Sequence, residues 1–109
     1  METNPPILHV HHGLIQRAKR NDRLAQGELY NLYFKAIYNS CLRIVGDAYS
    51  AEDLMQDAFI DAFKKLNQFE EQSTFGAWLK KIAIHKSINY LKREELISCL
   101  LYTSPSPRD

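Results

Sequence analysis

The sequence has few of the residues that build disulfide-bonded or zinc-bound scaffolds. It contains 2 cysteines in 109 residues, and Cys41 and Cys99 are far apart, with no Cys-x-x-Cys pair. A disulfide framework or a cysteine-based zinc ribbon needs more cysteines at closer spacing. We therefore expect a protein of a reduced, cytoplasmic setting with no metal site.

Long hydrophobic runs are also missing. No apolar segment approaches the roughly 18 to 20 residues that cross a bilayer. The opening METNPPILHV lacks the basic and apolar regions of a signal peptide. We expect neither export nor membrane insertion. The length of 109 residues gives room for about one domain.

The alternation of apolar and polar residues that marks half-buried strands does not occur over any useful length. Apolar residues instead recur at helical spacing, in segments separated by short turns. The sequence predicts an all-α fold, a compact bundle of about four helices. The expected helices span residues 12–19, 24–45, 51–66 and 75 to about 95, inside a helical domain of residues 12–96 that follows a flexible N-terminus of residues 1–11.

Polar residues at the segment ends predict where these helices begin and end. Asp22 and Ser73 are expected N-caps, because their side chains can accept hydrogen bonds from free backbone N–H groups. Gly46 is expected to end the second helix. Ser50 is expected to cap the third helix, with Asp53 completing a capping box.

Charge is segregated along the chain, although the formal net charge is only +1. Residues 17–43 are mostly basic, whereas residues 47–61 carry acids alone. Asp53, Asp57 and Asp61 are spaced four apart on the third helix, and each like-charge pair costs about 0.2 to 0.5 kcal/mol. Two interpretations follow: a solvated face kept acidic for solubility, or a docking surface for a basic partner.

The other side of the third helix is apolar and is expected to be buried. Its residues follow the i, i+3, i+4, i+7 rule of an amphipathic helix. The predicted buried stripe is Ala51, Leu54, Met55, Ala58, Phe59, Ala62, Phe63 and Leu66.

A mixed stripe runs along the fourth helix between two apolar flanks. It combines an aromatic ring, cations and an amide at spacings of 3, 4, 4 and 3 residues: Trp78, Lys81, His85, Asn89 and Lys92. Such residues suit nucleic acid, because Lys and His meet phosphates, Asn reads a base edge and an indole stacks on an unpaired base. The same pattern also fits a core tryptophan beside solvated lysines.

No arrangement for catalysis stands out in the sequence. There is no paired nucleophile and base, Gly-rich phosphate loop or carboxylate pair. We expect a non-enzymatic protein without a cofactor. His9, His11 and His12 are close together but have no carboxylate or cysteine beside them, which disfavours a metal site.

Two long sequence elements suggest a family. They are GDAYSAEDLMQDAF, which begins at Gly46, and FEEQSTFGAWLKKIAIHKSINYL, which begins at Phe69. With their flanking helices they cover about residues 13–95, and this segment resembles region 2 of bacterial sigma factors, specifically the extracytoplasmic-function (ECF) group of the sigma-70 family. Two long elements in the right order are far more specific than a single short motif.

The resemblance implies a partner for the acidic helix. In that family the corresponding helix binds the coiled-coil clamp helices of the large β′ subunit of RNA polymerase. The residues implied as contacts here are Glu52, Asp53, Gln56 and Asp57. Complementary charge would raise the association rate and fix orientation. An anti-sigma factor is a further expected partner.

The resemblance also implies that the domain recognises and melts the promoter −10 element through its non-template strand. Residues 69–74 would form the loop that holds a flipped base. The implied DNA contacts are Phe69, Ser73, Thr74, Trp78, Lys81, His85, Asn89, Lys92 and Arg93. Glu70 and Glu71 depart from the family pattern, where a basic or small residue frequently follows the phenylalanine, so we expect an altered base preference or weaker DNA contact.

The end of the chain departs from the family as well. Family members continue through a linker into a second helical domain that reads the −35 element, and nothing after Glu95 resembles it. Residues 97–109, which contain two Ser-Pro pairs, are expected to be a non-native or disordered tail. The alternative function is a helical protein-binding module that contacts polymerase or a regulator without binding DNA.

Overall fold

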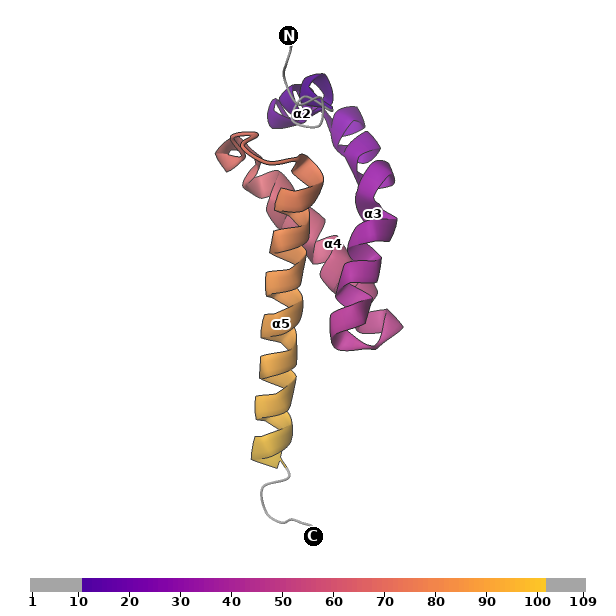
Figure 1. Ribbon diagram of the computed structural model, residues 1–109, viewed down its shortest axis with the longest axis vertical. Helices are drawn as coiled ribbons and strands as arrows, with labels where there is room; N and C mark the ends of the chain where they lie inside the picture. Colours follow the sequence, from indigo (N-terminus) through magenta and orange to yellow (C-terminus); the bar gives the residue numbers. More distant parts are fainter. Residues whose placement is uncertain (1–10, 102–109) are drawn as a thin grey trace.

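The computed structural model describes residues 11–101, and within that range the chain is predominantly helical. The elements in order are α2 (His12–Lys19), α3 (Arg23–Val45), α4 (Ala48–Lys64), the 3-10 turn η1 (Leu66–Gln68) and α5 (Phe75–Leu101) (Figure 1). No strand occurs among these described residues. The predicted all-α bundle is confirmed.

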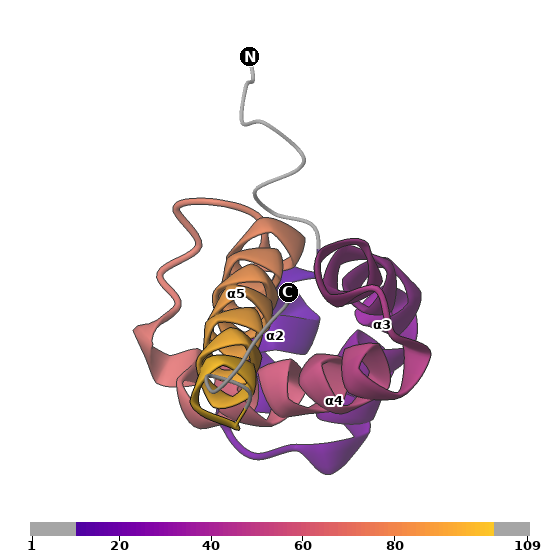
Figure 2. The same ribbon diagram turned by 90° about the horizontal axis from the view of Figure 1, so that it is seen from below.

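The three long helices pack against one another. Seen along the long axis of the molecule, α3, α4 and α5 surround a shared interior, and α2 lies across one end of this unit (Figure 2). α5 extends past the other two helices (Figure 1), and the side chains of residues 91–101 are exposed. None of the helices within residues 11–101 is long and apolar enough to cross a membrane.

The core forms where the apolar faces of the three helices meet. Leu29 of α3 and Leu79 of α5 are fully buried, and burying a side chain of this size contributes about 1.5 to 3 kcal/mol. The predicted stripe of the third helix is confirmed, with Phe63 half-buried and the other members buried. The buried residues of α4 and η1 are Ala51, Leu54, Met55, Ala58, Phe59, Ala62 and Leu66.

Two of the predicted helix ends are confirmed. The Oδ1 atom of Asp22 accepts hydrogen bonds from the backbone N–H groups of Leu24 at 3.0 Å and Ala25 at 3.3 Å. Gly46 ends α3 in the left-handed conformation, with φ of 74°, and its N–H donates to the carbonyl of Leu42 at 2.8 Å. A residue without a Cβ adopts this conformation at little cost.

The predicted start of the third helix is wrong by three residues, because α4 begins at Ala48. Asp47, directly after the glycine that ends α3, is the actual cap, and its Oδ2 accepts from the N–H of Ser50 at 2.8 Å. The predicted Ser50 cap and the capping box with Asp53 are therefore wrong. One residue ends a helix and the next one begins another, so α3 and α4 are joined by two residues.

The two ends of the fourth helix also differ from the prediction. Thr74, not Ser73, caps α5, because Thr74 Oγ1 accepts from the N–H of Ala77 at 3.1 Å. The helix then continues to Leu101, beyond the predicted end at about residue 95. No glycine or proline lies between Gly76 and Pro105 to stop it. Both Ser-Pro pairs lie outside the described residues.

The expected flexible N-terminus lies outside the described residues except for His11. This residue precedes α2 in the left-handed conformation, with φ of 67°. Its ring meets Tyr33 of α3 edge to face, with centroids 5.9 Å apart. The contact packs the start of α2 against α3.

Candidate functional site

The outward face of α4 carries the four residues that the sequence singled out, and all four are exposed. Glu52 and Gln56 lie toward α3, each beside a groove between α3 and α4. Asp53 and Asp57 lie toward α5 and line the groove between α4 and α5. The structure therefore brings these polar side chains together as two adjacent rows on one helix.

Asp61, the third of the aspartates spaced four apart on α4, forms an ion pair. Asp61 Oδ2 lies 3.0 Å from the Nζ atom of Lys65, four residues further on. A pair of this kind is partly exposed and contributes a few tenths of a kcal/mol, about 0.3 to 0.5. This ion pair offsets the repulsion that Asp61 adds to the acidic row, which consists of Asp53, Asp57 and Asp61. The repulsion between Asp53 and Asp57 remains.

The groove between α4 and α5 places opposite charges face to face. Its volume is about 340 Å³, and Lys86 and Arg93 of α5 line the wall opposite Asp53 and Asp57. Among the described ion pairs, none joins these acids to these bases. Their attraction therefore acts across solvent and weakens over a screening length of about 8 to 10 Å in moderate salt. Sequence reasoning missed Lys86, which stands outside the predicted stripe and shows its role only when α4 is packed beside it.

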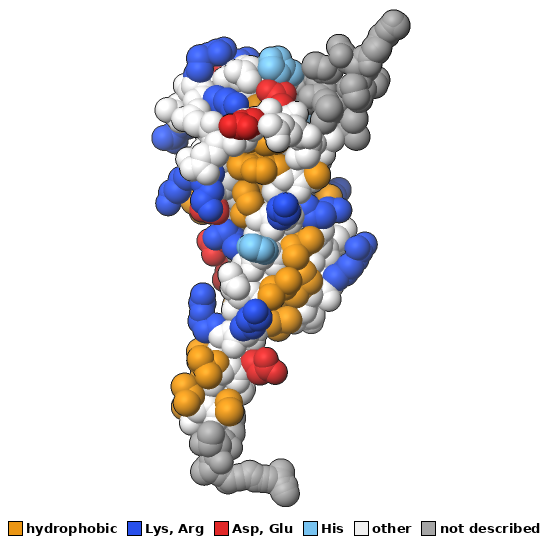
Figure 3. All heavy atoms as spheres, turned by 60° about the vertical axis from the view of Figure 1, so that its left-hand side comes forward, with side chains coloured by type: hydrophobic (Ala, Val, Ile, Leu, Met, Phe, Trp, Pro, Cys, Tyr) orange, Lys and Arg blue, Asp and Glu red, His pale blue; other side chains and the backbone are white. Residues whose placement is uncertain are grey.

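The predicted stripe on α5 turns around the helix between two grooves. Lys81 and His85 line a groove of about 650 Å³ between α3 and α5. Asn89 and Arg93 line the groove between α4 and α5. These side chains and Lys92 are exposed. The stripe thus crosses the outward side of α5 obliquely, and Figure 3 shows Lys and Arg side chains distributed along this side of the molecule beside apolar patches.

The two aromatic members of the predicted set pack together beneath this surface. Phe69 is 3% exposed, and the centroid of its ring lies 4.9 Å from that of Trp78. Phe75 lies against both rings, at 5.8 Å from each. Trp78 is half-buried. The Phe69 ring supports the loop from the core side, whereas part of Trp78 is accessible from outside.

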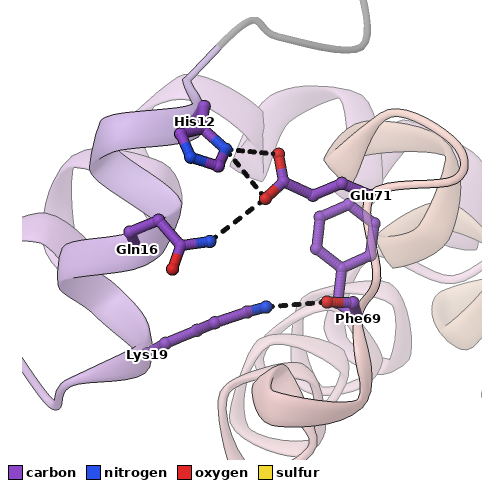
Figure 4. A network of polar contacts seen from close by, with 5 residues as sticks. All are labelled: His12, Gln16, Lys19, Phe69 and Glu71. Atoms are coloured by element: carbon purple, nitrogen blue, oxygen red, sulfur yellow. Dashed lines mark hydrogen bonds and ion pairs between the residues drawn. The ribbon is translucent and has the colours of Figure 1, made fainter.

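The loop between η1 and α5 is held from the N-terminal side of the chain (Figure 4). His12 Nδ1 lies 2.9 Å from both carboxylate oxygens of Glu71, and Gln16 Nε2 donates to the same carboxylate at 3.1 Å. Lys19 Nζ donates to the carbonyl of Phe69 at 2.8 Å. The three donors are spaced four and three residues apart on α2, which places them on one face of that helix.

The two acids of this loop have different surroundings. The side chain of Glu71 is only 16% exposed and points to α2, whereas Glu70 is exposed. Ser73 is exposed and Thr74 is half-buried as the cap of α5. The sequence indicated that both acids change the loop surface, but the structure turns one of them inward. Only one sequence signal could have predicted the contacts between this loop and α2. It is the helical spacing of His12, Gln16 and Lys19.

Gly76 in the first turn of α5 allows the close approach of α3. A Cβ atom at this position would lie 2.8 Å from the Cε1 atom of Tyr33. The Tyr33 ring also packs on Phe75, with centroids 5.5 Å apart. Burial raises the pKa of the Tyr33 hydroxyl above its ordinary value. The glycine therefore fixes how α5 and the loop before it sit on α3.

No group of three or more His, Cys, Asp or Glu side chains between residues 11 and 101 is arranged to hold a metal ion. His9 of the predicted histidine group lies outside the described range. Within that range, His12 instead bonds a single carboxylate, that of Glu71.

Comparison with known proteins defines the class of this helical domain. Residues 29–96 match the family described as Sigma-70 region 2, and the chain belongs to this family. The match begins within α3, so α2 lies outside it.

Individual relatives agree with this membership. The chain is 31% identical over 81 residues to the ECF RNA polymerase sigma factor SigW of Bacillus subtilis, which covers 74% of this chain and 43% of the relative. It is 38% identical over 78 residues to the RNA polymerase sigma-H factor of Pseudomonas aeruginosa, covering 72% and 40%. It is 32% identical over 78 residues to the ECF RNA polymerase sigma-E factor of Escherichia coli, again covering 72% and 40%. The chain spans less than half the length of these relatives.

A solved structure shows the same fold. It is the NMR structure of an engineered region 2 of sigmaE in complex with GTAAAA, with a TM-score of 0.70 and 29% sequence identity. The similarity covers 75% of this chain and 85% of that one. The sequence-based assignment to the ECF type of sigma region 2 is confirmed.

Proposed function

We propose that this chain is the region 2 part of a non-enzymatic transcription initiation factor. It docks on the clamp helices of RNA polymerase through α4, and it recognises and melts the promoter −10 element through the 69–74 loop and α5. The observation that carries the proposal is the placement of an exposed acidic row on α4 directly beside a cationic surface on α5, with both lining one groove. A basic partner and a polyanion can therefore be engaged on neighbouring surfaces.

The polymerase contacts are Glu52, Asp53, Gln56 and Asp57. All four side chains are exposed on one helix, and the repulsion between Asp53 and Asp57 is relieved when basic groups of a partner approach. Such complementarity raises the association rate and fixes the orientation of the complex. The same charge pattern suits an anti-sigma factor that presents basic side chains and competes for this row.

The DNA contacts divide into backbone and base contacts. Cations hold phosphates and position the strand, whereas amides, hydroxyls and aromatic rings select bases. Extruding a base from the stack costs a few kcal/mol, which contacts in the loop must return. Phe69 contributes by supporting the loop from the core. The other contacts are Ser73, Thr74, Trp78, Lys81, His85, Asn89, Lys92 and Arg93. The complex of the similar engineered sigmaE region 2 with GTAAAA supports a −10 sequence as the target.

The docking part is tested by binding of the chain to a clamp-helix fragment of bacterial RNA polymerase. The variant Asp53→Lys, Asp57→Lys is expected to remove binding. The matched control is Glu94→Lys, Glu95→Lys, which makes the same change of net charge at exposed positions of α5 and is expected to keep binding. Equal affinities for both variants would return the acidic row to the role of a solvated face.

The DNA part is tested with a single-stranded −10 oligonucleotide. Lys81→Ala, His85→Ala and Asn89→Ala change exposed side chains and are expected to weaken binding without unfolding the domain, unlike substitution of the packed Trp78. Arg20→Ala, at an exposed position beyond the end of α2, is the control. A chain that binds the clamp helices but no oligonucleotide would be a protein-binding module instead.

A further inference from the structure

Glu71 has a backbone conformation that a glutamate rarely adopts. Its φ is 57°, in the left-handed region where a side chain with a Cβ is disfavoured. Such a conformation persists only when the surrounding contacts hold it. Here the contacts come from α2, because His12 and Gln16 both bond the carboxylate.

A second, independent contact fixes the start of the loop. Lys19 Nζ donates to the carbonyl of Phe69 at 2.8 Å, while the Phe69 ring is buried against Trp78. Residues 69 and 71 are therefore both held, one through its backbone and ring and the other through its side chain. Glu70, between them, is exposed, and its Oε1 accepts a hydrogen bond from Gln72 Nε2 of the same loop at 3.5 Å.

The far end of the loop is fixed by α5. Thr74 Oγ1 caps the helix, and the close contact of Gly76 with Tyr33 sets the position of the first turn. The segment left between the two anchors, residues 72 and 73, is exposed. The exposed residues 72 and 73 thus lie between two anchored positions, Glu71 and Thr74.

We propose that α2 is the positioning element of this loop, with His12, Gln16 and Lys19 setting the conformation that determines which base the loop accepts. The inference rests on the proposed function, because it names residues that control the selectivity of the same site. None of the three residues belongs to the segment that matches the family. Glu71 acts through its bonds to α2, so the loop loses its fixed shape when the carboxylate is removed.

The experiment compares loop variants of the full chain in binding to a GTAAAA oligonucleotide and to the same strand with single base replacements. Glu71→Ala is expected to reduce the ratio of the two affinities by about tenfold, as for the loss of a hydrogen bond to a charged group. Glu71→Gln keeps an acceptor for Gln16 and is expected to restore part of the ratio. Glu28→Gln is the matched control, since it removes a carboxylate charge at an exposed position of α3 outside the loop, and is expected to keep the order of base preference.

Substitutions on α2 leave the loop sequence itself unchanged. The double variant His12→Ala, Gln16→Ala is expected to lower selectivity as much as Glu71→Ala does, and combining all three substitutions is expected to add little, because both sets remove the same contacts. Amide hydrogen exchange at residues 70 to 73 is expected to speed up in these variants. Binding to the clamp helices through the distant α4 row is expected to stay at the wild-type level, which a loss of folding would not allow.

Two results would overturn the inference. Wild-type selectivity and unchanged loop exchange in both Glu71→Ala and the α2 double variant would show that the loop holds its shape without α2. A wild-type chain that binds no oligonucleotide would remove the DNA-binding part of the proposed function and the selectivity role with it. The two failures are distinguishable, because DNA binding persists in the first and is missing in the second.

Discussion

The hydroxyl oxygens of Ser50 and Tyr90 lie 2.8 Å apart and join the first turn of α4 to α5. Both residues line the groove that separates the acidic row of α4 from the bases of α5. The bond therefore ties together the two helices that carry the proposed polymerase and DNA surfaces. Ser50, which the sequence predicted as a helix cap, lies inside α4 and uses its hydroxyl for this bond.

Tyr90→Phe removes this bond while keeping the ring. We expect the free energy of unfolding to fall by about 0.5 to 1.5 kcal/mol, the usual net contribution of one hydrogen bond. Urea titration of the variant measures the change. Tyr49→Phe is the control, because Tyr49 is 85% exposed, and no change is expected there. Equal losses from the two substitutions would contradict the role of the bond.

Gly76→Ala places a methyl group 2.8 Å from Tyr33 Cε1. We expect a loss of about 1 to 3 kcal/mol of stability, because the two helices must move apart or the ring must leave its packed position. Thermal or urea unfolding measures it. Gly27→Ala is the control in α3, where an added Cβ meets nothing within 4 Å, and a gain of about 0.5 to 1 kcal/mol is expected from reduced backbone freedom. A Gly76→Ala variant as stable as the wild type would refute the contact.

The lowered pKa of Asp22 predicts that stability depends on pH. The pKa of its carboxyl is lowered from 3.8, first by the hydrogen bond from the Arg17 side chain and then by the backbone N–H of Ala25. Because the folded pKa lies below the unfolded one, the stabilisation is present above about pH 4 and is lost as the pH falls through the folded value. Asp22→Asn keeps a capping side chain, so we expect a flatter stability profile below about pH 4. Superimposable profiles from urea unfolding at several pH values would count against this assignment.

Lys86 faces the acidic row across the groove and weakens the field that a basic partner experiences. Lys86→Gln is expected to raise the association rate with the clamp-helix fragment several-fold at low salt and to have little effect at high salt. Stopped-flow mixing at two salt concentrations measures the rates. Arg20→Gln changes the same charge on a different part of the surface and is expected to have a much smaller effect. If the effect of Lys86→Gln on the association rate did not change with salt, Lys86 would not act electrostatically on the aspartates across the groove.

The two cysteines are expected to differ in reactivity. Cys41 is fully buried in α3, and burial raises the pKa of its thiol, an effect that the Ser87 hydroxyl beside it partly opposes. Cys99 is exposed on α5. Because the thiolate is the reactive species, a thiol reagent should modify Cys99 in the folded protein and Cys41 only after denaturant is added. Two thiols reacting at equal rates without denaturant would contradict the buried position of Cys41.

Sequence patterns were sufficient wherever a feature depends on neighbours along the chain. The apolar stripe of α4 repeats every three or four residues, and the structure buries it as expected. Asp22 and Gly46 act within one turn of their own positions, so local chemistry identified them. The family assignment likewise depended on long ordered elements, which the match to residues 29–96 confirms.

The two wrong predictions of helix caps occurred where two residues could each take the same role. Ser50 and Asp47 can each cap a helix. Asp47 is the cap, because α3 ends directly before it. Ser50 instead bonds Tyr90 of another helix. Ser73 and Thr74 present the same ambiguity one residue apart, and Thr74 is the cap. Only the placement of the neighbouring elements decides between such candidates.

The sequence by itself determined that this chain forms amphipathic helices, that one carries an acidic face and another a cationic stripe, and that its ordered motifs belong to sigma region 2. Tertiary structure decided that Lys86 faces Asp53 and Asp57 across a groove and that Glu71 points inward to His12 and Gln16. The physical reason is the distance along the chain over which each interaction acts. Helix periodicity and capping arise from bonds within a few residues, whereas the partner of a polar side chain 55 to 59 residues away exists only after the core has fixed how the helices cross.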